Sequence, residues 1–127
     1  MRILVVLSLL VFLASDALAQ SSDPPSVFLL RERQEDRSEV RMLTSQFAPN
    51  TASPWHTHPA SVAIYVESGS GIWEIEGRPP RTVLAGQGLL EPANTRARVT
   101  NKNPKQVLRL ISFQISDPSR PFAILYK

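Results

Sequence analysis

NTASPWHTHPASVAIYVESG, residues 50–69, carries the strongest structural signal in the chain. Apolar and polar residues alternate over Ser61–Glu67, which is typical of a β-strand with one buried face, and Ser68-Gly69 then predicts a turn. His56 and His58 are the only two histidines of the chain. Because residues i and i+2 of an extended segment point to the same side, both imidazoles are expected to share one face.

Further short strands are predicted on either side of this stretch. Apolar residues alternate over residues 39–47, and β-branched or aromatic residues are concentrated in residues 71–76, 81–85 and 107–115. Turn-forming residues occupy 68–71, 77–80, 86–88 and 101–104. No window has the long 3.6-residue period of an amphipathic helix. We therefore predict an all-β fold, either a β-sandwich or a small antiparallel β-barrel.

The spacing of the histidines and of the later glycine and proline resembles the two motifs of the cupin superfamily. The first motif reads Gly-x5-His-x-His-x3–4-Glu-x6-Gly and the second reads Gly-x5-Pro-x-Gly-x2-His-x3-Asn. The corresponding positions of this chain are Asn50, His56, His58, Val62 and Gly69, and then Gly86, Pro92, Asn94, Ala97 and Asn101. The resemblance implies a double-stranded β-helix of the cupin jelly-roll type. Asparagine at two motif glycines is a mild change, because asparagine tolerates left-handed backbone.

Two positions depart from the ligand pattern of this family. Cupins that bind a metal use two histidines and a glutamate from the first motif and a histidine from the second, but here Val62 and Ala97 stand at two of those positions. Neither side chain has a lone pair for a metal. Imidazole suits Zn, Cu, Fe and Ni, yet His56 and His58 alone would hold a divalent transition metal loosely. We therefore expect an incomplete metal site, with both histidines lining the pocket as hydrogen-bonding groups.

Other polar side chains are available as substitute ligands. Glu91, Gln114 and Tyr65 lie in or next to predicted strands, and Glu91 precedes Pro92 at a position from which it could point into the barrel mouth. Its carboxylate would then be a third metal ligand from outside the family pattern. The residues expected to line the ligand pocket are His56, His58, Val62, Ala97, Glu91 and Tyr65.

The N-terminal residues resemble an export signal. Met1-Arg2 supplies positive charge, residues 3–14 are almost entirely apolar, and Ala17-Leu18-Ala19 has small residues at the cleavage positions. The alternative is an uncleaved membrane anchor, but the apolar run is short of the roughly 20 residues that span a bilayer. We predict a signal peptide at 1–19, a disordered linker at 20–26 and the cupin domain at 27–127. The protein is then periplasmic or secreted, with no membrane contact after cleavage.

Composition narrows the chemistry further. The 127 residues include 14 Lys and Arg, 11 Asp and Glu and no cysteine, with a formal net charge of +3. The lack of cysteine excludes disulfides, thiolate zinc sites and iron–sulfur clusters. The basic residues are scattered and form no stripe, so we predict no nucleic-acid partner.

These observations predict an exported single-domain cupin that binds a small-molecule ligand in its barrel pocket. A metal-dependent cupin enzyme, an oxygenase or isomerase that uses His56 and His58 with a third ligand from elsewhere, is the first alternative. A structural or assembly protein is the second. Apolar residues occur on both faces of the strand predicted at 107–115, so we expect this strand to be buried on both sides. This strand, or residues 121–126, would complete a homodimer.

Overall fold

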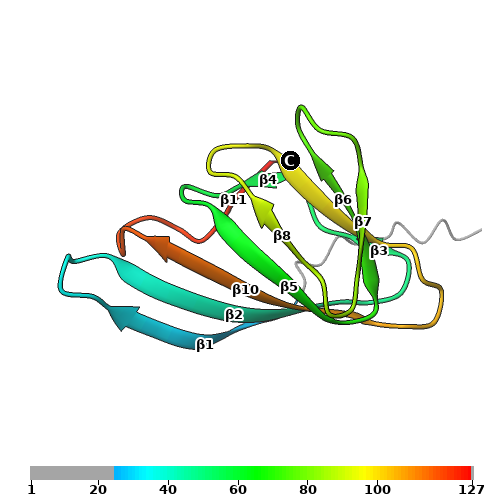
Figure 1. Ribbon diagram of the computed structural model, residues 1–127, viewed down its shortest axis with the longest axis horizontal. Helices are drawn as coiled ribbons and strands as arrows, with labels where there is room; N and C mark the ends of the chain where they lie inside the picture. Colours follow the sequence, from blue (N-terminus) through cyan, green and yellow to red (C-terminus); the bar gives the residue numbers. More distant parts are fainter. Residues whose placement is uncertain (1–24, 127) are drawn as a thin grey trace, which may run out of the picture.

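Short β-strands follow one another through residues 25–126, which are the residues that the computed structural model describes (Figure 1). The strands are β1 (Ser26–Arg33), β2 (Glu39–Phe47), β3 (Thr51–Ala52), β4 (His56–Thr57), β5 (Val62–Ser68), β6 (Ser70–Ile75), β7 (Arg81–Leu84), β8 (Gly88–Glu91), β9 (Ala97–Asn101), β10 (Leu108–Ser116) and β11 (Ile124–Leu125). Among these residues there is no apolar helix of membrane-spanning length. The predicted all-β class is confirmed.

The strands pair into two antiparallel sheets, which converge at one side of the molecule and diverge at the other (Figure 1). The first sheet has the order β1-β2-β10-β5-β8, and the second has the order β11-β4-β9-β6-β7 with β3 paired to β9. Neighbouring strands come from distant parts of the chain, since β10 lies between β2 and β5 and β9 lies between β4 and β6. This interleaving is the jelly-roll arrangement of a double-stranded β-helix.

The five strands predicted from sequence are found with ends that differ by one residue at most: they correspond to β2, β5, β6, β7 and β10. β1 begins at Ser26, which the predicted linker included, because this residue already pairs with Ser45 of β2. The predicted signal peptide and residues 20–24 of the linker lie outside the described residues.

The hydrophobic core lies between the two sheets and follows from the alternation of the strands. Along β5, Val62, Ile64 and Val66 are buried, whereas the residues between them point outward and are exposed. Trp73 of β6 packs against this row and is 1% exposed. The whole buried cluster comprises Phe47, Val62, Ile64, Val66, Trp73, Val83, Val99, Leu108 and Leu110.

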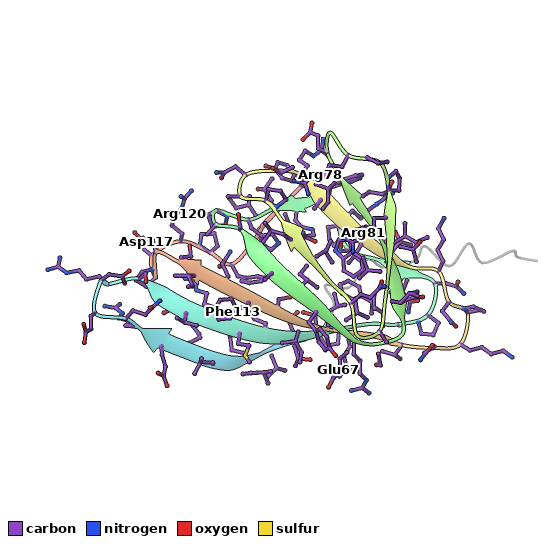
Figure 2. The ribbon with its side chains drawn as sticks, in the orientation of Figure 1. Glu67, Arg78, Arg81, Phe113, Asp117 and Arg120 are labelled. Atoms are coloured by element: carbon purple, nitrogen blue, oxygen red, sulfur yellow. The ribbon has the colours of Figure 1, made fainter. Side chains whose placement is uncertain are left out.

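The outer face of β10 differs from the sequence prediction. Leu108 and Leu110 are buried as expected, but Phe113 and Ile115 on the other face are 42% and 47% exposed. Phe113 is labelled in Figure 2. The first sheet has its partner layer on one side only, so no part of the described chain covers this face. The prediction of a strand buried on both faces is therefore wrong for the single chain, and the homodimer stays a prediction.

Left-handed backbone occurs where the cupin motifs have glycine. Asn50 and Asn94 both have φ near 55°, which asparagine adopts more readily than other side chains. Gly69, with φ of 80°, joins β5 to β6, and a Cβ atom there would lie 2.8 Å from the carbonyl oxygen of Val107. The tolerance of asparagine predicted at the two positions is confirmed.

Candidate metal centre

His56 and His58 are brought to one face of the second sheet by β4 and the residue after it. His56 pairs with Ala97 of β9, and the intervening Thr57 points to the other side, where its hydroxyl contacts the Tyr126 hydroxyl at 3.3 Å. The two imidazole rings lie edge to face with centroids 4.9 Å apart. The alternation predicted from the His-x-His spacing therefore holds.

Glu91 supplies a carboxylate from the first sheet. It is the last residue of β8 and is directly opposite Val62 of β5 in the register of the two antiparallel strands. Residues paired in this way point to the same face of the sheet, with Cβ atoms about 5 Å apart. The carboxylate missing from the motif position at Val62 is thus replaced by one on the neighbouring strand. Glu91 is 2% exposed.

Hydrogen bonds on their outer sides fix the orientation of both histidines. His56 Nδ1 lies 2.9 Å from the carbonyl oxygen of Pro54, and His58 Nδ1 lies 2.7 Å from that of Phe122. A carbonyl oxygen only accepts hydrogen bonds, so each Nδ1 must carry a proton. In the neutral form of each ring, Nε2 then has a free lone pair.

These Nε2 atoms converge on a single carboxylate oxygen. Oε2 of Glu91 lies 3.2 Å from His56 Nε2 and 3.0 Å from His58 Nε2. The other oxygen, Oε1, accepts a hydrogen bond of 2.9 Å from the indole Nε1–H of Trp73. A carboxylate oxygen and two imidazole nitrogens cannot satisfy one another without a cation between them, which is either a proton or a metal ion.

Without a metal, the electrostatics of the site favour the proton. Burial acts to raise the pKa of Glu91, but the hydrogen bonds and positive charge of His56 and His58 outweigh it and hold this pKa at about 2. Burial lowers the pKa of His56, and the hydrogen bond and charge of Glu91 more than offset it, so that this pKa lies above its usual 6.5. The metal-free site is therefore an imidazolium–carboxylate pair.

The same three side chains fit a metal ion. One donor atom from each of His56, His58 and Glu91 lies within 4.8 Å of the other two. Two imidazoles and a carboxylate suit Zn, Fe, Ni or Cu, and a three-ligand set leaves coordination positions open. The outer hydrogen bonds of the imidazoles hold them in the tautomer that metal ligation needs.

A cavity of about 330 Å³ adjoins this site between the two sheets. Its walls combine apolar side chains with a few polar ones, as small-molecule sites do. Glu91, His56 and His58 line the cavity at the candidate metal site. Ser45 and Ser112 line it elsewhere. The remaining lining residues are Ser26, Phe47, Ser53, Pro54, Val62, Ile64, Trp73, Val99, Leu110, Phe122, Ala123 and Leu125.

A buried polar network holds the C-terminal segment against the site. The guanidinium of Arg41 donates to the carbonyl oxygen of Arg120 at 2.9 Å and to Oε1 of Gln114 at 3.2 Å, near the end of β10 (Figure 2). Gln114 in turn donates through Nε2 to the carbonyl oxygen of Phe122 at 3.3 Å. The same carbonyl accepts the hydrogen bond from His58 Nδ1, so the network positions this imidazole indirectly.

The structure brings most of the predicted pocket residues together. His56, His58, Val62 and Glu91 line the cavity, and Ala97 is fully buried opposite His56 in β9. Ala97 is not among the residues that line the cavity, and Tyr65 lies away from it, 48% exposed on the outer face of the first sheet. Its placement in the pocket was wrong, since in β5 the residues next to the inward-pointing Ile64 and Val66 must point outward.

Two partners of the site escaped the sequence analysis. The indole N–H of Trp73 orients Glu91. The carbonyl of Phe122 orients His58. A backbone carbonyl has no residue-specific signature, and neither contact joins residues close in sequence, so no local pattern could have indicated them.

Comparison with solved structures gives the same architecture. The DMSP lyase DddQ from Ruegeria pomeroyi superimposes with a TM-score of 0.67 at 17% identity over 81% of this chain and 51% of that one, so the present chain spans about half of its length. A double-stranded beta-helix protein from Klebsiella pneumoniae gives a TM-score of 0.65 at 16% identity, covering 83% of this chain and 86% of that one. These likenesses show the fold alone.

An oxalate oxidase solved with the substrate analogue glycolate matches at 26% identity and a TM-score of 0.57, covering 68% of this chain and 45% of that one. No curated protein matches the chain. The cupin domain family matches residues 43–113, which include His56, His58, Glu91 and the strands around them. Since this match covers more than half of the sequence and the strands form a double-stranded β-helix, the chain belongs to the cupin family.

Proposed function

We propose that this cupin binds one divalent transition-metal ion through His56, His58 and Glu91 and uses it to bind a small molecule in the adjoining cavity. The observation that carries the proposal is the convergence of two Nε2 lone pairs on one carboxylate oxygen, at 3.2 and 3.0 Å. Both imidazoles are held in the tautomer that presents those lone pairs. Glu91 would be the third ligand that the cupin motifs alone did not supply.

The proposal favours the metal-dependent enzyme among the functions expected from the sequence. A bound ion would act as a Lewis acid toward an oxygen atom of the ligand. The chain itself orients both imidazoles through carbonyl oxygens, holds the carboxylate through the Trp73 indole and surrounds the ligand with apolar walls. The oxalate oxidase, at 26% identity, has a similar fold, which supports a catalytic use of the site.

Ligand binding without a metal is the second candidate, and one observation favours it. Among the described residues, no buried side-chain nitrogen or oxygen lacks a hydrogen-bond partner. Glu91, His56 and His58 therefore each have hydrogen-bond partners within the protein. In this case the histidines would contact the small-molecule ligand directly or exchange a proton with it.

Metal analysis of untagged protein, purified from its native compartment, separates the two candidates. We expect one equivalent of a transition metal in the wild type and none in His56→Ala. Thr57→Ala is the matched control, since Thr57 lies next to His56 but points to the opposite face. Metal-free protein whose melting temperature ignores both added ions and chelator would overturn the metal proposal and favour the second candidate.

We also propose that the protein is exported, on the strength of its signal-like N-terminus. N-terminal sequencing of protein from the periplasm or medium should begin at Gln20. Protein that stays in the cytoplasm with residues 1–19 attached would contradict export without affecting the metal proposal.

A further inference from the structure

We propose that the cavity takes a monocarboxylate with a compact apolar body and rejects dicarboxylates of the same shape. This inference rests on the proposed function, because it counts the charge of a metal at His56, His58 and Glu91. It goes beyond that function by naming the chemical class of the ligand.

The charges that face the cavity support a ligand with one negative charge. A divalent ion with the Glu91 carboxylate and two neutral histidines has a net charge of +1. Every other lining residue is uncharged. A monoanion neutralises this site, whereas a dianion leaves one negative charge that no cation of the lining offsets and a neutral ligand leaves one positive charge. An uncompensated charge in an apolar cavity costs several kcal/mol even after relaxation.

Arg41, a buried cation on β2, does not change this charge count. Arg41 occupies the inward face of β2 but does not line the cavity. Its Nε–H donates to Glu39 Oε1 at 2.6 Å, and its remaining donors are engaged by Gln114 and by backbone carbonyls. The donors of this guanidinium are therefore engaged within the protein, on a carboxylate that it shares with Arg31, and the side chain does not reach the ligand cavity.

The walls and size of the cavity define the body of the ligand. Val62 and Ile64 of β5 and Leu110 of β10 lie between Glu91, on one edge strand, and Ser45 on β2, near the other edge. The cavity volume of about 330 Å³ is about twice the roughly 150 Å³ that accommodates one benzene molecule. A compact ring or branched chain therefore fits, with its carboxylate at the metal.

Hydroxyl groups are the polar partners available beyond the apolar walls. Ser112 lies on β10 beside Ile64 of β5, and Ser45 lies on β2 beside Leu110. The Ser45 hydroxyl is 2.8 Å from that of Ser26. Hydroxyls bind a neutral polar substituent of the ligand but do not neutralise a second carboxylate.

Three probes of the same outline test the charge preference: 4-nitrobenzoate (monoanion), terephthalate (dianion) and 4-nitrobenzamide (neutral). Protein comprising residues 20–127 is loaded with Co²⁺. The visible absorption bands of this ion report first on metal uptake and then on probe binding. We expect 4-nitrobenzoate to bind at least roughly 10-fold more tightly than either terephthalate or the amide, because each of these leaves one charge uncompensated.

A cation introduced into the cavity wall should weaken the discrimination against terephthalate. Ser45→Lys places an ammonium group among the lining residues at the less buried end, and terephthalate binding should improve at least roughly 10-fold relative to 4-nitrobenzoate. Thr44→Lys is the matched control. Thr44 directly precedes Ser45 in β2 and points to the opposite face, so its variant should keep the wild-type preference.

The outcomes separate this inference from the function beneath it. Protein that takes up no Co²⁺ overturns the proposed function and the inference together. Protein that takes up Co²⁺ but binds the three probes with similar affinity, or binds none of them, overturns the inference and leaves the metal site standing. A Thr44→Lys variant that behaves like Ser45→Lys would likewise overturn it, because the preference would then follow overall charge.

Discussion

Replacing Glu91 by glutamine changes the site by one atom and should abolish metal binding while keeping the fold. The Trp73 indole N–H only donates, so the amide oxygen of the new side chain must take the place of Oε1. The amide nitrogen then replaces Oε2, which lies 3.2 and 3.0 Å from the Nε2 atoms of His56 and His58. Its two hydrogens would bond to the two lone pairs that a metal needs.

The expected loss of affinity follows from these distances. Breaking two amide–imidazole hydrogen bonds costs about 2 kcal/mol together. The variant also lacks the negative charge that would face the ion, and a unit charge pair about 3 Å apart is worth about 5 kcal/mol at an effective dielectric constant near 20. A 1000-fold weaker dissociation constant corresponds to about 4 kcal/mol. We therefore expect at least that loss for Glu91→Gln.

The assay is competition for Zn²⁺ against a chromophoric chelator, with untagged protein at neutral pH and circular dichroism to verify the fold. Glu67→Gln is the matched control, because Glu67 is exposed on the outer face of β5 (Figure 2). It should bind Zn²⁺ like the wild type. A folded Glu91→Gln variant with affinity within about tenfold of the wild type would refute Glu91 as a ligand and the tautomer reasoning with it.

Metal affinity should fall by about tenfold per pH unit below the raised pKa of His56, because its Nε2 must lose a proton before it binds a metal; calorimetric titrations that give a flat profile between pH 5.5 and 8 would contradict this. In the metal-free protein, the lowered pKa of Glu91 contributes roughly 3 kcal/mol of stability above pH 4.5, lost as the pH falls toward about 2, and the raised pKa of His56 contributes stability below pH 6.5, lost as the pH rises through that pKa. The free energy of unfolding, measured with urea across this pH range, should therefore be highest between pH 4.5 and 6.5. A monotonic pH profile would contradict the imidazolium–carboxylate pair. Gln114→Met should weaken Zn²⁺ binding about tenfold by releasing the carbonyl that orients His58, whereas Gln46→Met, on the outer face of β2, should not; equal affinities would remove Gln114 from this role. If the predicted homodimer uses the outer sheet face, light scattering should find a dimeric wild type and a monomeric Phe113→Asp variant, and a monomeric wild type would end that prediction.

Much of the fold was predictable because its signals are local. The alternation of apolar residues located β2 and β5 to within one residue, since the two-residue period of a strand is a property of neighbouring residues. The same period placed His56 and His58 on one face. Asn50 and Asn94 were compatible with motif glycines because their side chain tolerates positive φ, which is also a local property.

The third donor of the candidate metal site was decided by tertiary structure. From the motif, Val62 indicated a lost ligand, but the antiparallel pairing of β5 with β8 places Glu91 directly beside it. Tyr65 was assigned to the pocket by polarity alone, although the register of β5 turns it outward. The sequence by itself determined the strands and the histidine pair, because these depend on neighbours along the chain. Only the tertiary structure decided that a carboxylate joins them, because cross-strand pairing unites residues that no local period connects.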